Sequence, residues 1–455
     1  MTEDSKQTPL LYKLDDRPSV AAASFAGLQH VLAMFGGILT APLIVALGMG
    51  LDAADTTYVI AAALVVSGFA TLVQVNRLGP LGTGLLSVQG TSFAFIGPLI
   101  FSYEKLVLDM SSSDALGVIF GSSVVCGLVV MGLSVYIKHL RNIITNNVAG
   151  ATIILLGLSL VFTTLSGLQR EFLSAGGLAG DGLKMLLLAF LVFIIILFLS
   201  LQRLAWLRLS SITLGLAIGV AVASFMGLVD FSGVHLESVI FIPEIGRYPL
   251  GVDLQIIAIL MPIYLVSAME SVGDITATAN LSGLSTEGEG YWSRMRGGIM
   301  AGAFASMIAS ILSTFPSTTF SQNNGVIRLT GVASRFVGSY VAIFLVLLGI
   351  SPLIARLFQT IPSVVVYGGT LLMFMLVVLS GFRVVQGNQA KQRDYLVVGL
   401  AILFGYGIST SIQWVSVLPS GVVTILQFPV STGAMCAILL ELIVPRQVHA
   451  ADTSD

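Results

Sequence analysis

The feature that most limits the fold of this chain is its series of apolar segments long enough to cross a membrane. About fourteen such segments follow one another along the 455 residues. They lie near residues 20–47, 57–75, 82–102, 115–137, 143–166, 183–202, 211–229, 253–272, 297–314, 316–333, 337–358, 362–381, 394–411 and 421–444. Charged residues make up only 10% of the chain, whereas a soluble domain carries about 25%. The sequence therefore predicts an all-α membrane protein that crosses the bilayer many times.

The charge balance and the cysteines exclude several other classes. A net charge of −2 argues against a nucleic-acid partner. Cys126 and Cys436 both fall in apolar runs, where we expect them to act as small packing residues. No Cys/His spacing is typical of a zinc site. We therefore expect no disulfide framework, no metal and no bound cofactor.

The positions of Lys and Arg predict the orientation in the membrane. With fourteen spans and an inner N-terminus, 16 of the 21 Lys and Arg residues fall in inner segments and five in outer ones. The outer five are Lys105, Arg170, Lys184, Arg247 and Arg356. An error of one span early in the count would remove this bias. We therefore expect both termini to be cytoplasmic.

Two of the fourteen segments are irregular, and both are interrupted by polar residues. The third segment carries Ser87-Val88-Gln89-Gly90-Thr91-Ser92-Phe93 at its centre, and the tenth runs from Pro316 to Gly325. Seven spans separate them, as two repeats of seven spans would require, and an odd repeat length inverts the second copy. Interrupted segments at matching places in two halves indicate a transporter binding site.

Several polar residues fall at membrane depth in other spans. Glu270 and Asp274 follow the apolar run of the eighth span, and Gln29-His30 lies in the first. A charge at the bilayer centre costs about 2.5–3.5 kcal/mol on insertion scales, so such residues are mostly functional. Structural alternatives remain open at this point. Asp274 could cap a helix, and His30 could be a satisfied core residue. Gln89 could be an interhelical hydrogen-bonding residue.

These residues suit a planar heterocycle. The amides of Gln89 and Gln322 present a donor beside an acceptor, and a carboxylate such as Glu270 can accept two ring N–H bonds. Uracil, xanthine and urate have edges with adjacent C=O and N–H groups. Aromatic rings could stack on the flat ligand, and the candidates are Phe93, Phe95 and Phe320. The sequence thus favours a nucleobase site.

Three motifs resemble the nucleobase–ascorbate transporter family, also called nucleobase–cation symporter family 2. Gln322-Asn323-Asn324-Gly325-Val326-Ile327-Arg328-Leu329-Thr330-Gly331 resembles the family signature. Gln29-His30 is similar to its first-span pair, and Glu270-Ser271-Val272-Gly273-Asp274 to its eighth-span acidic motif. The resemblance covers essentially the whole chain, and bacterial xanthine permeases look most similar because they carry Gln-Asn-Asn-Gly.

The resemblance implies fourteen spans in two inverted repeats, with short strands in spans three and ten. It implies a core of spans 1–4 and 8–11 and a gate of spans 5–7 and 12–14. The core would move like an elevator against the gate, and transport would be coupled to proton symport. The gate would also form a homodimer in a bacterial inner membrane. The expected boundaries are a cytoplasmic tail at 1–19, core at 20–137 and 253–361, gate at 138–252 and 362–445, and a second tail at 446–455.

The resemblance also implies roles for individual residues. Glu270 and Gln322 would hold the base, Asn323 would tune affinity and His30 would shape the site. The expected substrate-binding residues are Glu270, Gln322, Gln89, Ser92, Phe93, Asn323 and His30. The residues expected to serve proton coupling or the mechanism are Glu270, Asp274 and Gln29.

Three positions depart from the pattern of xanthine permeases. Gly302 stands where an Asp is common, Arg328 where a Gln is common, and Ser92 where xanthine-selective members often have Asn. The smaller Ser92 would leave room for urate beside xanthine. A uracil or other nucleobase permease of the same fold is the alternative within the family. A channel or a membrane-embedded enzyme is the alternative from another class.

Overall fold

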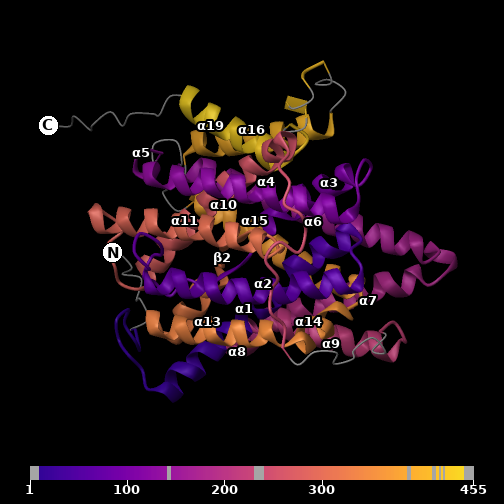
Figure 1. Cartoon of the computed structure of the whole chain (residues 1–455), viewed down its shortest axis with the longest axis horizontal. Helices are drawn as coiled ribbons and strands as arrows, with labels where there is room; N and C mark the ends of the chain where they lie inside the picture. Colours follow the sequence, from indigo (N-terminus) through magenta and orange to yellow (C-terminus); the bar gives the residue numbers. More distant parts are fainter. Residues whose placement is uncertain are drawn as a thin grey trace. The chain divides into compact units, whose positions relative to one another are not determined.

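The computed structural model describes residues 10–140, 145–229, 240–386, 391–411, 417–419, 422–423 and 426–444. These residues form mainly helices, with two short strands among them (Figure 1). The chain divides into two compact units. The first comprises Met1–Lys138 and Leu160–Phe374, and the second His139–Ser159 and Met375–Asp455. The core and gate boundaries expected from the sequence remain predictions.

The first unit contains most of the secondary structure. Its helices are α1 (Val20–Met49), α2 (Ala53–Asn76), α3 (Ile96–Leu106), α4 (Ser112–Leu133), α7 (Gly182–Ser200), α8 (Ala205–Leu209), α9 (Ser211–Phe225), α10 (Leu254–Leu281), α11 (Gly288–Ile311), α12 (Gln322–Thr330), α13 (Arg335–Ile350) and α14 (Pro352–Gln359). Its strands are β1 (Gln89–Thr91) and β2 (Ser317–Thr319), and its 3₁₀ turns are η1 (Phe93–Phe95), η2 (Ser134–Tyr136) and η3 (Gly177–Ala179). Helices with residues in both units are α5 (Ile137–Leu140), α6 (Asn146–Ser174) and α15 (Ser363–Gln386).

Short polar side chains begin several of these helices. Ser19, Asp52 and Asp253 each accept a hydrogen bond from a backbone N–H in the first turn of the helix that follows. An N-cap of this kind satisfies a backbone donor that has no partner inside the helix. Gly50 ends α1 in the left-handed conformation, with φ of 66°, which a glycine adopts without a Cβ clash. The apolar sequence between such signals therefore folds as long helices.

The helix lengths agree with a membrane protein that has several spans. Among the described residues, seven helices are long and apolar enough to cross a membrane, and the bent pair α13–α14 would make eight. Each expected segment contains at least one helix or strand, although the segment 421–444 lies partly outside the described residues. The total of fourteen spans and the inverted repeat remain predictions.

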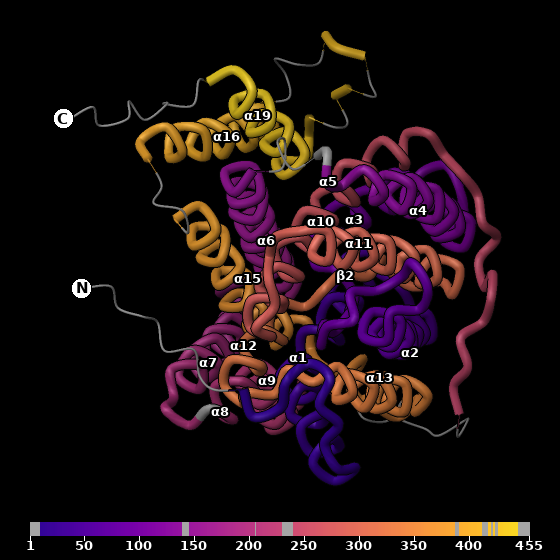
Figure 2. Tube along the Cα trace, turned by 90° about the vertical axis from the view of Figure 1, so that its left-hand side faces the viewer, coloured from indigo at the N-terminus to yellow at the C-terminus, as the bar shows by residue number. Residues whose placement is uncertain are grey.

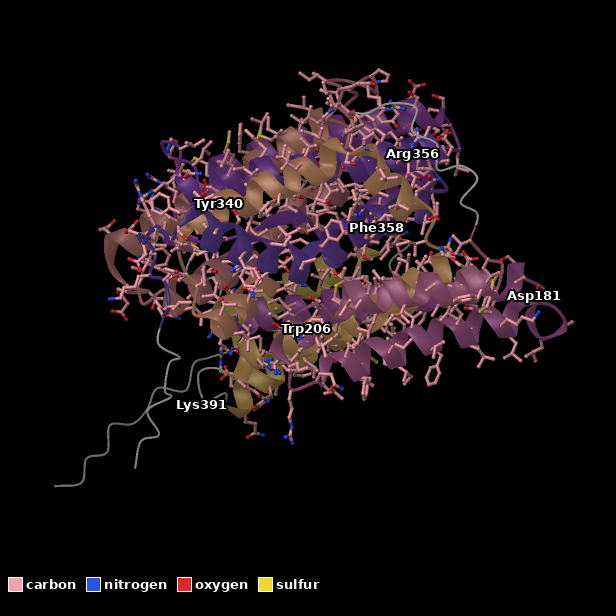
Figure 3. All side chains as sticks on the ribbon, turned by 90° about the horizontal axis from the view of Figure 1, so that it is seen from below. Asp181, Trp206, Tyr340, Arg356, Phe358 and Lys391 are labelled. Carbon is pink, nitrogen blue, oxygen red and sulfur yellow. The ribbon has the colours of Figure 1, made fainter. Side chains whose placement is uncertain are left out.

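One expected span is bent. The sequence predicted a single segment over 337–358, but α13 and α14 meet at 72°. Proline disfavours helical backbone at the residue before it, and Ser351, which precedes Pro352, is extended. The bend lets Phe358 of α14 pack edge-on against Phe35 of α1, with ring centroids 5.4 Å apart (Figure 3 labels Phe358).

Small residues allow close helix packing in the first unit. Helices α1, α2 and α13 run side by side (Figures 1 and 2). A Cβ on Gly68 of α2 would lie 2.6 Å from the carbonyl oxygen of Ala342, and one on Gly349 of α13 would lie 2.7 Å from the nitrogen of Val65. Both approaches are too short for a side chain, so these glycines set the distance between α2 and α13.

The second unit contains α16 (Gln392–Thr410) and α19 (Pro429–Ile443), which pack against each other. A buried polar cluster joins them to the start of α6. Asn147 donates to Asp394 at 2.7 Å and to Glu441 at 3.1 Å. Arg393 contacts both carboxylate oxygens of Glu441 at 3.2 Å and donates to the carbonyl of Val444 at 2.8 Å. We call Asn147, Arg393, Asp394 and Glu441 the α16–α19 cluster.

Candidate functional site

The candidate site is built around the two short strands, all within the first unit. β1 and β2 pair antiparallel, with Gln89 opposite Thr319 and Thr91 opposite Ser317. Ser92 donates its N–H to the carbonyl of Pro316 at 2.9 Å, which extends the pairing by one residue. A Cβ on Gly90 would lie 2.6 Å from the ring of Phe320, so only glycine permits this approach. The pairing buries polar residues of both irregular segments in the interior.

Each strand leads directly into a helix. β1 continues through η1 into α3, and β2 is followed by α12, which Gln322 begins. Backbone N–H groups at helix starts have no partner within the helix. Irregular backbone at membrane depth is tolerated only where it is enclosed by protein or lines a cavity. The two interrupted segments thus place two helix starts at the buried strand pair.

Helix α10 brings the two carboxylates to strand β2. Thr319 donates its hydroxyl to the carboxylate of Asp274 at 2.8 Å. Glu270 precedes Asp274 by four residues, so the two side chains lie one turn apart on the same face of α10. Glu270 is partly buried and forms no hydrogen bond or ion pair with any residue that the structure describes. Of the two carboxylates, only Asp274 has a hydrogen-bond partner among the described residues.

His30 and Asn323, 293 positions apart, form a buried pair. The imidazole Nδ1 lies 2.8 Å from the side-chain oxygen of Asn323. Because the Asn323 amide nitrogen donates to the carbonyl of Leu86, its oxygen is the acceptor, and Nδ1 of His30 must be the protonated nitrogen. The other ring nitrogen, Nε2, is buried and has no partner among the residues that the structure describes. Gln29, the neighbour of His30, is half-buried and forms no hydrogen bond among the described residues.

The two glutamines differ in burial. Gln89 is 1% exposed, and neither the oxygen nor the nitrogen of its amide has a partner in the part of the chain that the structure describes. Its backbone N–H donates to the hydroxyl of Thr71 at 3.0 Å, which fixes the chain there. Gln322 is half-buried, and its amide forms no hydrogen bond with the described residues. Leaving a buried polar group unsatisfied costs about 1–3 kcal/mol, so the Gln89 amide is suited to receive a ligand.

The other two expected binding residues lie just after β1. Ser92 is 1% exposed, and its hydroxyl accepts a hydrogen bond from the N–H of Ala94 at 3.3 Å, so it caps η1. Phe93 is half-buried, with its ring centroid 6.0 Å from that of Phe320 and 5.5 Å from that of Phe374. Phe95, by contrast, packs edge-on against Tyr264 at 4.8 Å, in the interior. Phe93 is therefore the more accessible of the two β1-side rings.

Sequence reasoning missed several contacts around the site. It assigned no role to Thr319, which binds Asp274, or to Thr278, which donates to Asn324 at 2.7 Å. It also missed Phe374 of α15, whose ring contacts Phe93. The two threonines could have been noticed because they belong to polar runs within apolar segments. Phe374 carried no such signal, since aromatic residues are common in spans.

Comparison with known proteins identifies the family. The sequence model of the Permease family, Xan_ur_permease, matches residues 21–414. The xanthine permease XanP of Escherichia coli (strain K12) is 35% identical over 445 residues, which cover 97% of this chain and 96% of the relative. The xanthine permease XanQ of the same strain is 36% identical over 437 residues, covering 96% and 94%. The chain belongs to the nucleobase–ascorbate transporter family. Since these relatives are permeases, this member is a multi-pass membrane transport protein and not an enzyme.

Solved structures support the same type of fold for this family member. The transmembrane domain of the cyanobacterial bicarbonate transporter BicA aligns with a TM-score of 0.57 at 14% identity, covering 94% of this chain and 99% of that chain. The murine anion transporter Slc26a9 aligns with a TM-score of 0.59 at 12% identity, covering 95% and 69%. At such low identity the likeness concerns the fold alone.

Proposed function

We propose that the protein is a proton-coupled symporter that imports purine nucleobases, with xanthine as its main substrate and urate as a weaker one. The observation that carries this proposal is the buried Gln89 amide, whose nitrogen and oxygen both lack a partner among the described residues. Adjacent C=O and N–H groups on a nucleobase edge would satisfy the two atoms together. The similarity to two xanthine permeases favours a purine over other heterocycles.

The strand register supports a position of the carboxylates near this amide. Side chains directly opposite each other on paired strands share one face of the sheet, so Gln89 shares a face with Thr319. Thr319 binds Asp274, and Glu270 lies one turn away on the same helix. A carboxylate without a protein partner can accept two ring N–H bonds from the base. We therefore assign Glu270, Gln89 and Gln322 to direct contacts with the base.

The remaining predicted residues complete the proposed site. Phe93 would stack on the ring, and His30 with Asn323 would shape one wall. Ser92 would border the base. Asp274 and Gln29 would serve the mechanism together with Glu270, which would couple proton and substrate binding. The hydrogen bond from Thr319 to Asp274 supports a link between the carboxylates and strand β2.

We further propose an elevator-type alternating-access movement of a core against a gate, with the gate forming a homodimer. The protein would lie in a bacterial inner membrane with both termini in the cytoplasm. The excess of Lys and Arg in the predicted inner segments supports this orientation. The resemblance of the motifs to the family supports the movement and the dimer.

Uptake of labelled xanthine into cells or proteoliposomes tests the proposed function. We expect saturable uptake that a protonophore abolishes and that unlabelled xanthine, then urate, competes. A requirement for sodium without sensitivity to the protonophore would contradict proton coupling. Stronger competition by uracil than by xanthine would replace the purine assignment with a pyrimidine one. Uptake that does not saturate would indicate a channel.

A further inference from the structure

A small cavity lies behind strand β2, between α10 and α11. Its volume is about 20 Å³, and a single water molecule requires roughly 10–15 Å³. Hydroxyl groups dominate the polar part of its wall. They belong to Tyr264, Ser267, Ser271, Ser306 and Ser317.

One of these hydroxyls has no partner. Ser267 is 7% exposed, and its side chain forms no hydrogen bond with any residue in the described part of the chain. Its carbonyl oxygen is already occupied, because it accepts a hydrogen bond from the hydroxyl of Ser271 at 3.0 Å. The Ser267 hydroxyl therefore lines the cavity with an unused donor and unused lone pairs.

Two further hydroxyls have used their proton but keep free lone pairs. Ser271 donates to the carbonyl of Ser267 and accepts from the hydroxyl of Thr318 at 3.5 Å, so one of its two lone pairs stays free. Ser317 donates to the carbonyl of Gly90 at 3.1 Å. Ser306, by contrast, is occupied, since it contacts the carbonyl of Ser317 at 2.9 Å and accepts the N–H of Ser317 at 3.1 Å. The cavity thus offers one donor and two acceptors that the protein leaves free.

We propose that this cavity is a binding site for one ordered water molecule. The water would accept a hydrogen bond from Ser267 and donate to Ser271 and Ser317. Three hydrogen bonds are typical of a buried water. The absence of a carboxylate from the wall suits a neutral ligand rather than a cation. The water would join α10 to β2 beside the bond between Thr319 and Asp274.

The proposal gives a reason for glycine at position 302. A Cβ at Gly302 would find nothing within 4 Å, so the position is not glycine to avoid a clash with its neighbours. Gly302 lines the cavity instead. A methyl group there would enter the space that the water needs. A hydroxymethyl group would enter it as well, but would supply a polar partner for Ser267.

A high-resolution map of the full-length protein in detergent or nanodiscs tests the site directly. We expect a density peak at about 2.7–3.0 Å from the hydroxyls of Ser267, Ser271 and Ser317. An empty cavity in a map that resolves other buried waters overturns the proposal. A peak that accompanies a sodium-dependent rise in melting temperature also overturns it, because the occupant would then be a cation.

Variants give a second, independent test through melting temperature. Without a water, Ser267→Ala would remove an unpartnered hydroxyl and leave the melting temperature unchanged or higher. With the water, we expect a fall of about 1–3 °C.

Gly302→Ala should show a similar fall, and Gly302→Ser should restore part of it. Gly290→Ala is the matched control, because Gly290 is an exposed glycine of the same helix with open space around it. It replaces a glycine in the first turn of the same helix without touching the cavity. Equal behaviour of Gly302→Ala and Gly290→Ala would contradict the proposal.

Discussion

Two regions of this molecule bury polar side chains among apolar helices, and they differ in how those side chains are satisfied. In the α16–α19 cluster, Arg393, Asn147 and both carboxylates bind one another or nearby backbone. At the strand pair, Glu270 and the amide of Gln89 have no partner among the described residues. A satisfied buried cluster holds helices together, whereas unsatisfied groups destabilise the empty protein. The difference marks the strand pair as the place for a ligand.

The strongest test of this comparison is Glu270→Gln. We expect it to reduce nucleobase uptake by roughly 100-fold or more, because two charge-assisted hydrogen bonds of about 1.5–3 kcal/mol each would be weakened. Uptake should be normalised to the amount of protein in the membrane. The melting temperature of the empty protein should not fall, since the charge of Glu270 has no protein partner. Uptake like that of the wild type would remove Glu270 from the site.

A Glu-to-Gln substitution in the α16–α19 cluster should lower stability and leave substrate binding unchanged, which is the opposite of the effect expected for Glu270→Gln. Glu441→Gln removes the nearer of the two carboxylates beside Arg393, and Asp394 at 3.5 Å remains. The Glu441 side chain is only 4% exposed. Breaking a buried ion pair costs about 3 kcal/mol or more. We therefore expect a clear fall in thermal stability, measured by unfolding in detergent. The KM of the protein that still folds should stay unchanged, and a large change in KM would mean that the cluster also serves binding.

Substituting one amide in each region, Gln89 at the strand pair and Asn147 in the α16–α19 cluster, sharpens the comparison between the two. Gln89→Leu removes an amide that has no partner, so the empty protein should gain up to about 1–3 kcal/mol of stability while its affinity for the base falls. Asn147→Leu removes two hydrogen bonds to carboxylates, so its stability should fall by a similar amount. Thermal unfolding and binding titrations measure both effects. Loss of stability in Gln89→Leu would show that the amide has a structural partner.

The sequence predicted which residues belong to the candidate site better than it predicted the contacts between them. Glu270 and Gln89 could be found because a polar residue inside an apolar segment is expensive, and the Gln322-Asn323-Asn324-Gly325 run interrupts a span. The bond between His30 and Asn323 could not be predicted, because 293 residues separate them and the pairing depends on how the spans pack.

The α16–α19 cluster was not predicted for a different reason. Asn147 and Glu441 lie near the ends of apolar segments, where polar residues are ordinary. Their burial arises only when α16, α19 and the start of α6 assemble around Arg393. The bend between α13 and α14 was also missed, although Pro352 marks its position.

The smallest expected effect concerns selectivity. Ser92 caps η1 through its hydroxyl, and Asn is as good an N-cap as Ser, so Ser92→Asn should keep the fold. The larger side chain would narrow the space beside the base. Because pockets discriminate against a small added group by only about 1–3 kcal/mol, a change near the low end of that range would be enough to disfavour urate. We therefore expect the ratio of xanthine to urate uptake to rise, measured by competition in the same vesicles.

Ser92→Ala is the control, because it removes the cap without adding bulk, and it should lower stability without raising the ratio. An unchanged ratio in Ser92→Asn, or wild-type protein that ignores urate, would show that Ser92 acts only as the cap of η1.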